Sequence, residues 1–371
     1  MTFGDINASS IDRYIVAVIN AGATDLLLAA DSPPRMRVDG KLRPIHGEPV
    51  LRDEDVSEMV LKMLPQKLRT ELLDRKEVDF SFSYEHTHRF RANCFIAQGT
   101  IAMSLRAIPL AIPTPEELRL PAALAGVCEL PQGFVLVTGP TGSGKSTTLA
   151  SCIDYINRFR PLHILTIEDP IEYVHQHKVA AVNQREVGLD TESFDRALRS
   201  ALREDPDVIL VGEMREPETI QFALTLAETG HLVFATLHTN DAAQALDRVS
   251  DVFPPERQEQ IKVQLAASIV AVVSQRLIPK VGGGLIAAFE LLLANNAVRN
   301  LVREGRTHQL RNIMHSARGD GMLTLEASLN DLLAEGLIEY EEAVSRSMHA
   351  KELKRPDSAR TQLTNVAVSV G

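Results

Sequence analysis

Cysteine is scarce in this sequence, and its three copies, Cys94, Cys128 and Cys152, form no C-x-x-C pair. This scarcity disfavours a disulfide framework and a zinc site built on paired cysteines, and it fits a reducing cytoplasm. A long apolar run is also lacking, because polar residues interrupt the most apolar late stretch, 263–273. That stretch is far short of the ~20 residues of a membrane-spanning helix, so we expect membrane contact only through a partner.

An excess of positive charge is lacking as well. The 371 residues include 39 basic and 49 acidic side chains, which gives a formal net charge of −10. Proteins that bind nucleic acid usually show a basic surface, so we expect no nucleic acid as a partner, although a local basic patch stays open. The N-terminal segment contains no basic stretch followed by an apolar core, so we expect no signal peptide.

The clearest motif that is present is GPTGSGKST, residues 139–147, which fits the phosphate-binding pattern G-x-x-x-x-G-K-[ST]. An apolar run at 133–138 predicts a buried strand before it, and 147–156 predicts a helix after it. Backbone N–H groups of such a loop point at phosphate oxygens, and the helix N-terminus adds a positive dipole. A chance glycine-rich turn is the alternative, which the lysine and serine at the fixed positions disfavour.

The loop therefore supplies a set of candidate nucleotide-binding residues. These are Gly139, Thr141, Gly142, Ser143, Gly144, Lys145, Ser146 and Thr147. We expect Lys145 to reach the β- and γ-phosphates of ATP, and the Ser146 hydroxyl to bind Mg²⁺.

Two predicted strands end in acidic residues. The run 164–167 is followed by Glu168 and, a little later, Glu172, and the run 207–211 is followed by Gly212 and Glu213. The second run is similar to a Walker B strand, with a glycine where an aspartate usually stands. Carboxylates at the carboxyl ends of core strands suit metal binding and the positioning of a water, so we expect these acids to carry out those two tasks. Ordinary carboxylates that cap the next helix are the alternative.

Histidines lie on both sides of the predicted strand 232–237. His231 and His238 are seven residues apart, so in a straight strand they face opposite sides and cannot converge on one zinc ion. One of them could reach the nucleotide, whereas strand-end histidines bonded to backbone are the alternative.

Arg89, Arg91 and Arg106 occupy alternate or matching positions of adjacent predicted strands, so we expect them to line one face of a sheet. They could form a solvated basic face. They could also be offered to nucleotide phosphates, including those bound by a neighbouring subunit, because a guanidinium is planar, multidentate and always charged.

The order of predicted elements divides the chain into four parts. Helices, a hairpin around Asp39-Gly40 and a meander predict an α+β domain over 1–108, and prolines mark 109–121 as a linker. From 122 to 350, strands alternate with helices, which predicts a doubly wound α/β nucleotide-binding core. We expect one long helix over 255–278, a strand or buried run at 287–293 and helices from 297 onward. The final part, 351–371, is polar, and we expect a flexible tail.

Four segments in a fixed order resemble the secretion ATPase superfamily. They are GPTGSGKSTT, HILTIEDPIEY, LREDPDVILVGEMRE and AETGHLVFATLHTND, which match its Walker A, Asp, atypical Walker B and His boxes. More narrowly, the chain resembles the type IV pilus retraction ATPases of the PilT type over roughly residues 10–345. The narrower match includes DLLLAADSPPRMRVDGKLRPI, NQREVGLDT and AVRNLVREG, of which the last is similar to the family's AIRNLI motif.

This resemblance implies a RecA-like P-loop NTPase core, a PAS-like α+β N-terminal domain and a helical C-terminal portion. It implies a homohexameric, Mg²⁺-dependent ATPase at the inner face of the cytoplasmic membrane, which it contacts through an inner-membrane pilus platform protein, with a paralogous retraction ATPase as a further partner. The implied catalytic residues are Glu213, Glu172, Lys145, His238, His231, Arg89, Arg91 and Arg106, and the implied metal ligands are Ser146, Glu213 and Glu168.

Three other interpretations stay open. The family's PilU-type accessory motors are the nearest, favoured by EYVHQH and by the residues beyond ~350, whereas EDPDVILVGEMR and AVRNLV favour the PilT type. Pilus assembly and type II secretion ATPases usually carry an extra N-terminal domain and four zinc-binding cysteines, and the sequence contains neither. A RecA-like nucleic-acid translocase and an ATP-binding regulator without hydrolysis belong to different classes. The acidic net charge disfavours the translocase. The strand-end carboxylates disfavour a regulator that binds ATP without hydrolysing it.

Overall fold

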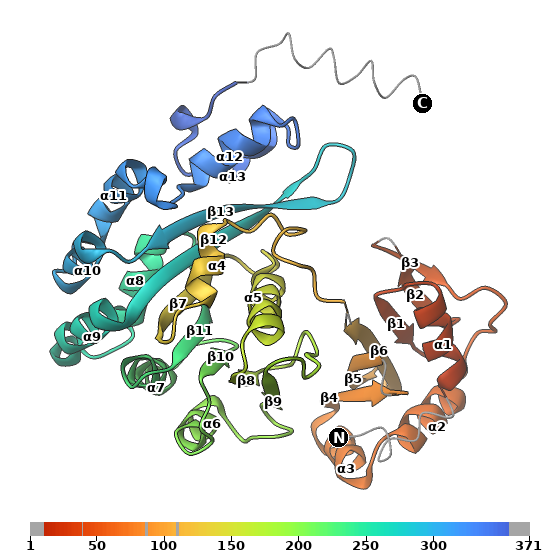
Figure 1. Cartoon of the computed structure of the whole chain (residues 1–371). Coiled ribbons are helices and arrows are strands. Elements are labelled where there is room, and N and C mark those ends of the chain that lie inside the picture. The colour runs from red at the N-terminus through yellow and green to blue at the C-terminus, as the bar shows by residue number, and fades with distance from the viewer. Residues whose placement is uncertain (1–10, 39, 86–87, 109–110, 356–371) are drawn as a thin grey trace. The chain divides into compact units, whose positions relative to one another are not determined.

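A computed structural model describes residues 11–38, 40–85, 88–108 and 111–355 of the chain (Figure 1). The chain forms two compact units. Unit 1 comprises residues 1–111 and 172–174, and unit 2 comprises 112–171 and 175–371. The Pro-rich residues from 112 onward therefore belong to the second unit.

Unit 1 is an antiparallel sheet covered by helices. Its six strands lie in the order β3-β2-β1-β6-β5-β4. Its elements are α1 (Asp12–Asn20), β1 (Asp25–Leu28), β2 (Arg35–Val38), β3 (Lys41–Pro44), α2 (Asp53–Met63), α3 (Gln66–Arg75), β4 (Glu77–Tyr84), β5 (His88–Ala97) and β6 (Thr100–Ile108). Tyr14 and Ile15 of α1 join Val60 of α2 in a core with Phe82 and Phe90, whose rings stack with centroids 5.6 Å apart.

Unit 2 is built on a seven-stranded sheet with the order β13-β12-β7-β11-β10-β8-β9. The strands are β7 (Gly133–Thr138), β8 (His163–Glu168), β9 (Ala181–Glu186), β10 (Val208–Val211), β11 (Leu232–Leu237), β12 (Ile269–Pro279) and β13 (Leu285–Leu293). All neighbours pair in parallel except β12 and β13, which form an antiparallel hairpin. The carboxyl ends of β7, β11, β10 and β8 therefore meet at one edge of the sheet.

Helices cover both faces of this sheet. They are α4 (Ala123–Cys128), α5 (Lys145–Phe159), α6 (Phe194–Ala201), α7 (Pro217–Glu228), α8 (Ala242–Asp251) and α9 (Pro255–Ser268). Along β7, Phe134 and Leu136 pack with α6 to α9, whereas Val135 and Val137 pack with α4 and α5. Burial on both faces explains why the central strands are uniformly apolar.

The prediction of one long helix over 255–278 is wrong. Helix α9 ends at Ser268, and β12 begins at Ile269. The β-branched run that follows is buried between β7 and β13, so tertiary pairing outweighs the helical pattern of the sequence. Strand β9 was not predicted, because it is a short, largely polar edge strand beside β8.

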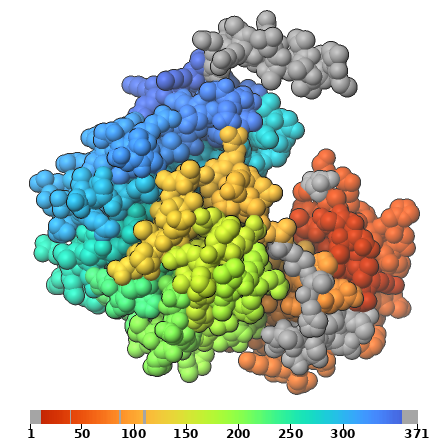
Figure 2. Space-filling model, viewed as in Figure 1, coloured from red at the N-terminus to blue at the C-terminus, as the bar shows by residue number. Residues whose placement is uncertain are grey.

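Helices follow β13, as the sequence predicted. They are α10 (Asn296–Arg303), α11 (Leu310–Ser316), α12 (Leu325–Ala334) and α13 (Tyr340–Arg346), with short 3₁₀ turns at Thr307–Gln309, Arg318–Asp320 and Ala350–Glu352. Figure 2 shows this C-terminal part, in blue, packed directly on the cyan β12–β13 segment. Within the described residues, no helix has both the length and the apolar character needed to cross a bilayer.

Part of the expected flexible tail is ordered. The Lys354 N–H donates to Asn330 Oδ1 at 2.8 Å, and Leu353 is buried among α12 and α13. Residues 356–371, which make up the rest of that prediction, lie outside the described residues.

Candidate nucleotide site

The glycine-rich loop joins the end of β7 to α5, whose first residue is Lys145. Gly139 has a φ of 144°, and a Cβ there would lie 2.5 Å from the Gln275 carbonyl oxygen and 2.6 Å from Ser143 Oγ. Gly144, with a φ of 88°, is the N-cap of α5. The loop thus has a backbone that only glycine adopts at these points, directly before a helix N-terminus that favours an anion.

Lys145 is held inside this loop. It is 9% exposed, and its Nζ donates to the carbonyl oxygens of Gly139 at 2.9 Å and Pro140 at 3.2 Å. Thr141 and Gly142 lie in the same loop, and Ser146 and Thr147 lie in the first turn of α5. The ammonium group is therefore placed where the loop would surround a phosphate group.

Gln275 of β12 supports the loop and was not predicted. It is 2% exposed, and its Nε2 donates to the Ser143 carbonyl oxygen at 2.5 Å. Its Oε1 is buried and has no hydrogen-bond partner among the described residues. A strand assignment at 269–279 would have revealed it, because β12 runs beside β7 and so passes the phosphate loop.

Glu213 follows β10 at the same edge of the sheet. Arg215 donates to both of its carboxylate oxygens, from Nε at 2.6 Å and from Nη2 at 2.8 Å. His238 Nε2 lies 3.1 Å from Glu213 Oε1. The pKa of Glu213 is lowered, chiefly by the Arg215 bonds, with His238 adding to the effect against partial burial. The carboxylate is therefore ionised at neutral pH and can accept protons or bind a cation.

His238 links the loop to this carboxylate. Its Nδ1 lies 3.4 Å from Lys145 Nζ, and its Nε2 faces Glu213. An ammonium group only donates and a carboxylate only accepts, so the contacts assign the proton to Nε2 and the lone pair to Nδ1. β11 pairs with both β7 and β10, which is why the residue that follows β11 lies between them.

Gly212 stands where a Walker B strand usually has an aspartate, and the neighbouring strand explains the difference. A Cβ on Gly212 would lie 3.1 Å from Glu168 Cα and 3.2 Å from the Ile167 carbonyl oxygen. Glu168 Oε1 accepts from Thr166 Oγ1 at 2.7 Å and from Gln184 Nε2 at 3.1 Å. The close approach of β8 therefore leaves little space for a side chain at position 212, and Glu168 lies at the same edge of the sheet as Glu213 because β8 and β10 are parallel.

His231 does not join this group. It precedes β11, whereas His238 follows it, so the two lie at opposite edges of the sheet. His231 Nδ1 lies 2.9 Å from the Leu226 carbonyl oxygen at the end of α7. This contact matches the backbone-bonded alternative that the sequence left open.

Four other predicted site residues belong to unit 1. Glu172 is one of them, in the short segment 172–174. Arg91 of β5 lies directly opposite Arg106 of β6, and Arg89 is two residues along β5, so the three share one face as expected. Arg106 Nε donates to Asp25 at 2.8 Å, whereas Arg91 is exposed and has no ion-pair partner among the described residues.

The oxygen atoms at the sheet edge fit a magnesium ion that arrives with phosphates. Within the described ranges, no group of three or more His, Cys, Asp or Glu side chains could hold a metal ion. Mg²⁺ in nucleotide sites commonly uses one or two protein oxygens together with phosphates and waters. Ser146, Glu168 and Glu213 offer a hydroxyl and two carboxylates of that kind.

The fold and the loop together define an α/β P-loop ATPase core, and comparisons with known proteins agree. The family model for "Type II/IV secretion system protein" matches residues 114–314. A crystal structure of the pilus retraction motor PilT with bound ADP superposes with a TM-score of 0.87 at 46% identity, covering 92% of this chain and 98% of that one.

Three relatives carry the comparison further. The "Type IV pilus retractation ATPase PilT" of Pseudomonas aeruginosa is 49% identical, over 87% of this chain and 93% of its own. The "Twitching motility protein" of Neisseria gonorrhoeae is 49% identical, over 86% of each chain. The "Type IV pilus ATPase PilU" of P. aeruginosa is 40% identical, over 92% of this chain and 90% of its own.

The chain therefore belongs to the type II/IV secretion system protein family and, within it, to the type IV pilus retraction ATPases. This confirms the fold class and the family that the four boxes predicted. It is an ATPase and uses nucleotide.

Proposed function

We propose that the chain is one subunit of a homohexamer that hydrolyses ATP to retract type IV pili and so drives twitching motility. The observation that carries the proposal is the continuous contact from Lys145 through His238 to Glu213, which joins the phosphate loop to a strand-end carboxylate. Two relatives named for pilus retraction and twitching motility support the pilus side. The motor works on the cytoplasmic side, through an inner-membrane platform protein and with a paralogous retraction ATPase.

ATP binding exchanges the contacts of Lys145. Its ammonium leaves the Gly139 and Pro140 carbonyl oxygens for the β- and γ-phosphates, while backbone N–H groups at the start of α5 bind phosphate oxygens. His238 then loses its contact with Lys145 and keeps the one with Glu213. Nucleotide binding at the phosphate loop thereby changes the surroundings of the Glu213 carboxylate through His238.

Hydrolysis is an in-line attack by a water on the γ-phosphorus. Glu213 or Glu172 orients that water and accepts its proton, the bond to the bridging oxygen breaks, and ADP and phosphate result. Lys145 stabilises the charge that builds on the bridging oxygen. Glu213 must first release Arg215, which holds both of its oxygens.

Ser146, Glu168 and Glu213 are the residues that we propose would hold Mg²⁺, which would neutralise charge on the β- and γ-phosphate oxygens. Arg89, Arg91 and Arg106 are proposed to contact phosphates bound by a neighbouring subunit. His238, at the same sheet edge as the loop, is the histidine that we propose for the site, since His231 lies at the other edge.

A PilU-type accessory motor is the second candidate. The relative of that name is 40% identical, against 49% for the PilT relative, so the retraction motor itself is favoured. A nucleic-acid translocase would show ATPase activity that DNA stimulates and that salt strongly weakens. ATP turnover with and without DNA therefore separates a pilus motor from a nucleic-acid translocase.

ATP turnover of the purified protein tests the site. We expect Lys145→Ala and Glu213→Gln each to reduce turnover by at least about a hundredfold, because each loses a group that acts on the phosphates or the water. Glu341→Gln, an exposed change on α13, is the matched control. Wild-type turnover in either site variant would refute the assignment. In cells, deletion of the gene should leave excess surface pili, whereas loss of pili would indicate an assembly motor.

A further inference from the structure

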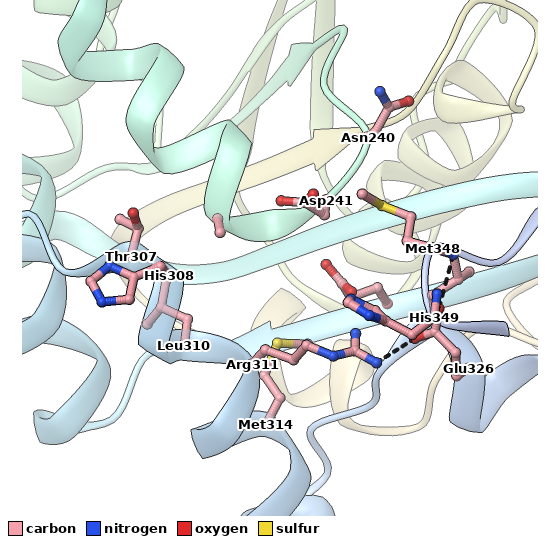
Figure 3. Close-up of a pocket in the computed structure, with 13 residues that line it drawn as sticks. Asn240, Asp241, Thr307, His308, Leu310, Arg311, Met314, Glu326, Met348 and His349 are labelled. Atoms are coloured by element: carbon pink, nitrogen blue, oxygen red, sulfur yellow. Dashed lines mark hydrogen bonds and ion pairs between the residues drawn. The ribbon is translucent and has the colours of Figure 1, made fainter. Parts of the chain in front are cut away.

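A cavity lies in unit 2, formed by residues that take no part in the nucleotide site. Its volume is about 230 Å³, and it lies between the start of α8, strand β13, helices α11 and α12, and residues 348–349 (Figure 3). Its lining residues are Asn240, Asp241, Ala243, Glu290, Thr307, His308, Leu310, Arg311, Met314, Leu325, Glu326, Met348 and His349. Pockets for drug-sized ligands are ~300–1,000 Å³, so this one suits a smaller molecule.

Glu290 of β13 gives the cavity an acidic end. It is 6% exposed, and its Oε1 accepts from the Ala242 N–H at 2.8 Å. Its other carboxylate oxygen has no hydrogen-bond partner among the described residues. A buried carboxylate oxygen on a cavity wall without a protein partner can accept a hydrogen bond from a ligand in the cavity.

Arg311 is the only arginine or lysine among the lining residues, and its charge is already matched. Its Nη2 donates to Glu326 at 2.7 Å and to Glu352 at 2.8 Å, and Figure 3 shows it directed toward Glu326. Asp241, as the N-cap of α8, accepts from the Gln244 N–H at 2.7 Å. The Ala242 and Gln244 N–H groups at the start of α8 are therefore already bonded to carboxylates of the protein. Asp241 and Glu290 thus leave unbalanced negative charge, which repels an anion and favours a cation.

Part of the cavity wall is apolar. Leu310, Met314, Leu325 and Met348 line the same cavity, and all but Met348 are at least nine-tenths buried. Such walls bind a short hydrocarbon chain through contact area, and methionine adapts its shape to the ligand. His308 and His349 are the remaining titratable groups that face the cavity.

We propose that this cavity is a binding site for a small alkylammonium compound. The ammonium group lies against the carboxylates of Glu290 and Asp241, and the alkyl chain lies against Leu310 and Met314. Burial, with Asp241 and Glu326 nearby, raises the pKa of Glu290 to about 7. A bound cation therefore favours the carboxylate form and releases protons at neutral pH.

Calorimetric titration of the full-length, nucleotide-free protein with n-butylamine, which is an alkylammonium ion at pH 7, tests this site. We expect saturable binding to the wild type at pH 7, with a heat that changes with the ionisation enthalpy of the buffer because protons are released. Glu290→Gln keeps the acceptor for the Ala242 N–H but loses the charge. It should weaken binding by about tenfold or more and abolish the buffer dependence.

Two further variants make the test specific. Asp241→Asn keeps an equally good N-cap for α8 and should weaken butylammonium binding several-fold. Asp320→Asn, an exposed change outside the cavity, should bind as the wild type does. The absence of binding to the wild type would overturn the proposal. Equal affinity in the wild type and in folded Glu290→Gln would overturn it too, because butylammonium would then bind elsewhere.

Discussion

Glu326 and Glu290 line the same cavity, yet their pKa values move in opposite directions. Burial alone would raise the pKa of Glu326, but bonds from Arg311 and Ser347 outweigh it and lower the pKa to about 2. Glu290 lacks an ion-pair partner among the described residues, so burial dominates and raises its pKa to about 7. Glu326 receives direct hydrogen bonds from the Arg311 guanidinium and Ser347, whereas Glu290 feels Arg311 only through its charge, and this difference accounts for the opposite signs of the two shifts.

This difference predicts how stability depends on pH. Since the folded pKa of Glu290 exceeds its ordinary value of 4.5, the folded state binds the extra proton, and stability is lost as pH rises from about 4.5 to about 7. Glu290→Gln removes this loss, so its free energy of unfolding should exceed that of the wild type by about 2–3 kcal/mol at pH 8 and match it near pH 4.5. Urea denaturation at the two pH values measures the difference.

Glu326→Gln is the opposing variant in that experiment. The folded pKa of Glu326 is depressed, so its contribution is present above about 4.5 and is lost only as pH falls toward 2. The substitution should therefore lower stability throughout the neutral range, because it breaks the pair with Arg311. A Glu290→Gln difference that did not vary between pH 4.5 and pH 8 would contradict the assigned pKa.

At the scale of single elements, the sequence predicted the central strands well and the outer ones poorly. The runs 208–211 and 232–237 match β10 and β11, because continuous apolar stretches between polar turns have few alternatives. The 255–278 stretch was misassigned, since its second half becomes a strand only through pairing with β7 and β13. No local pattern contains that information.

The same error concealed Gln275, and its role gives the next prediction. Gln275→Met keeps the volume but loses the bond to the Ser143 carbonyl oxygen, so the phosphate loop should be less well fixed. We expect the KM for ATP to rise by about tenfold while the melting temperature stays within a few degrees of that of the wild type. Steady-state kinetics and thermal unfolding measure the two quantities.

Gln258→Met on α9 is the control for that variant, because within the part of the chain that the structure describes the Gln258 side chain bonds only the nearby Phe253 carbonyl oxygen. It should leave the KM unchanged. An unchanged KM in Gln275→Met would show that the loop keeps its conformation without support from β12.

At the scale of the whole molecule, part of the candidate site follows from the fold and part does not. Lys145, Glu213 and His238 meet because parallel strands end at one edge of a sheet. The sequence predicted carboxylates at the ends of these strands but left open which of the two histidines reaches the nucleotide. The arginines belong to another unit, and the sequence predicted their common face but not the site that they serve. Strand periodicity fixes the face of a residue, whereas the identity of its partner depends on assembly.

A mixing experiment tests whether Arg91 completes the site of a neighbouring subunit. We expect Arg91→Ala and Lys145→Ala homomers each to lose most ATP turnover, because every site in the first lacks the arginine and every site in the second lacks the lysine. In mixed rings, a Lys145-bearing subunit will sometimes adjoin an Arg91-bearing one. Random equal mixing should make about a quarter of the interfaces complete and restore turnover to about that fraction of the wild type.

The control is a mixture of Lys145→Ala with Glu213→Ala. Both residues lie at one sheet edge of one subunit, so no interface regains a full set through this mixture, and turnover should stay low. Recovery with Arg91→Ala but not with Glu213→Ala would place the arginine in trans. If neither mixture recovered activity although native mass spectrometry showed mixed rings, the proposal that Arg91 completes the site of a neighbouring subunit would be refuted.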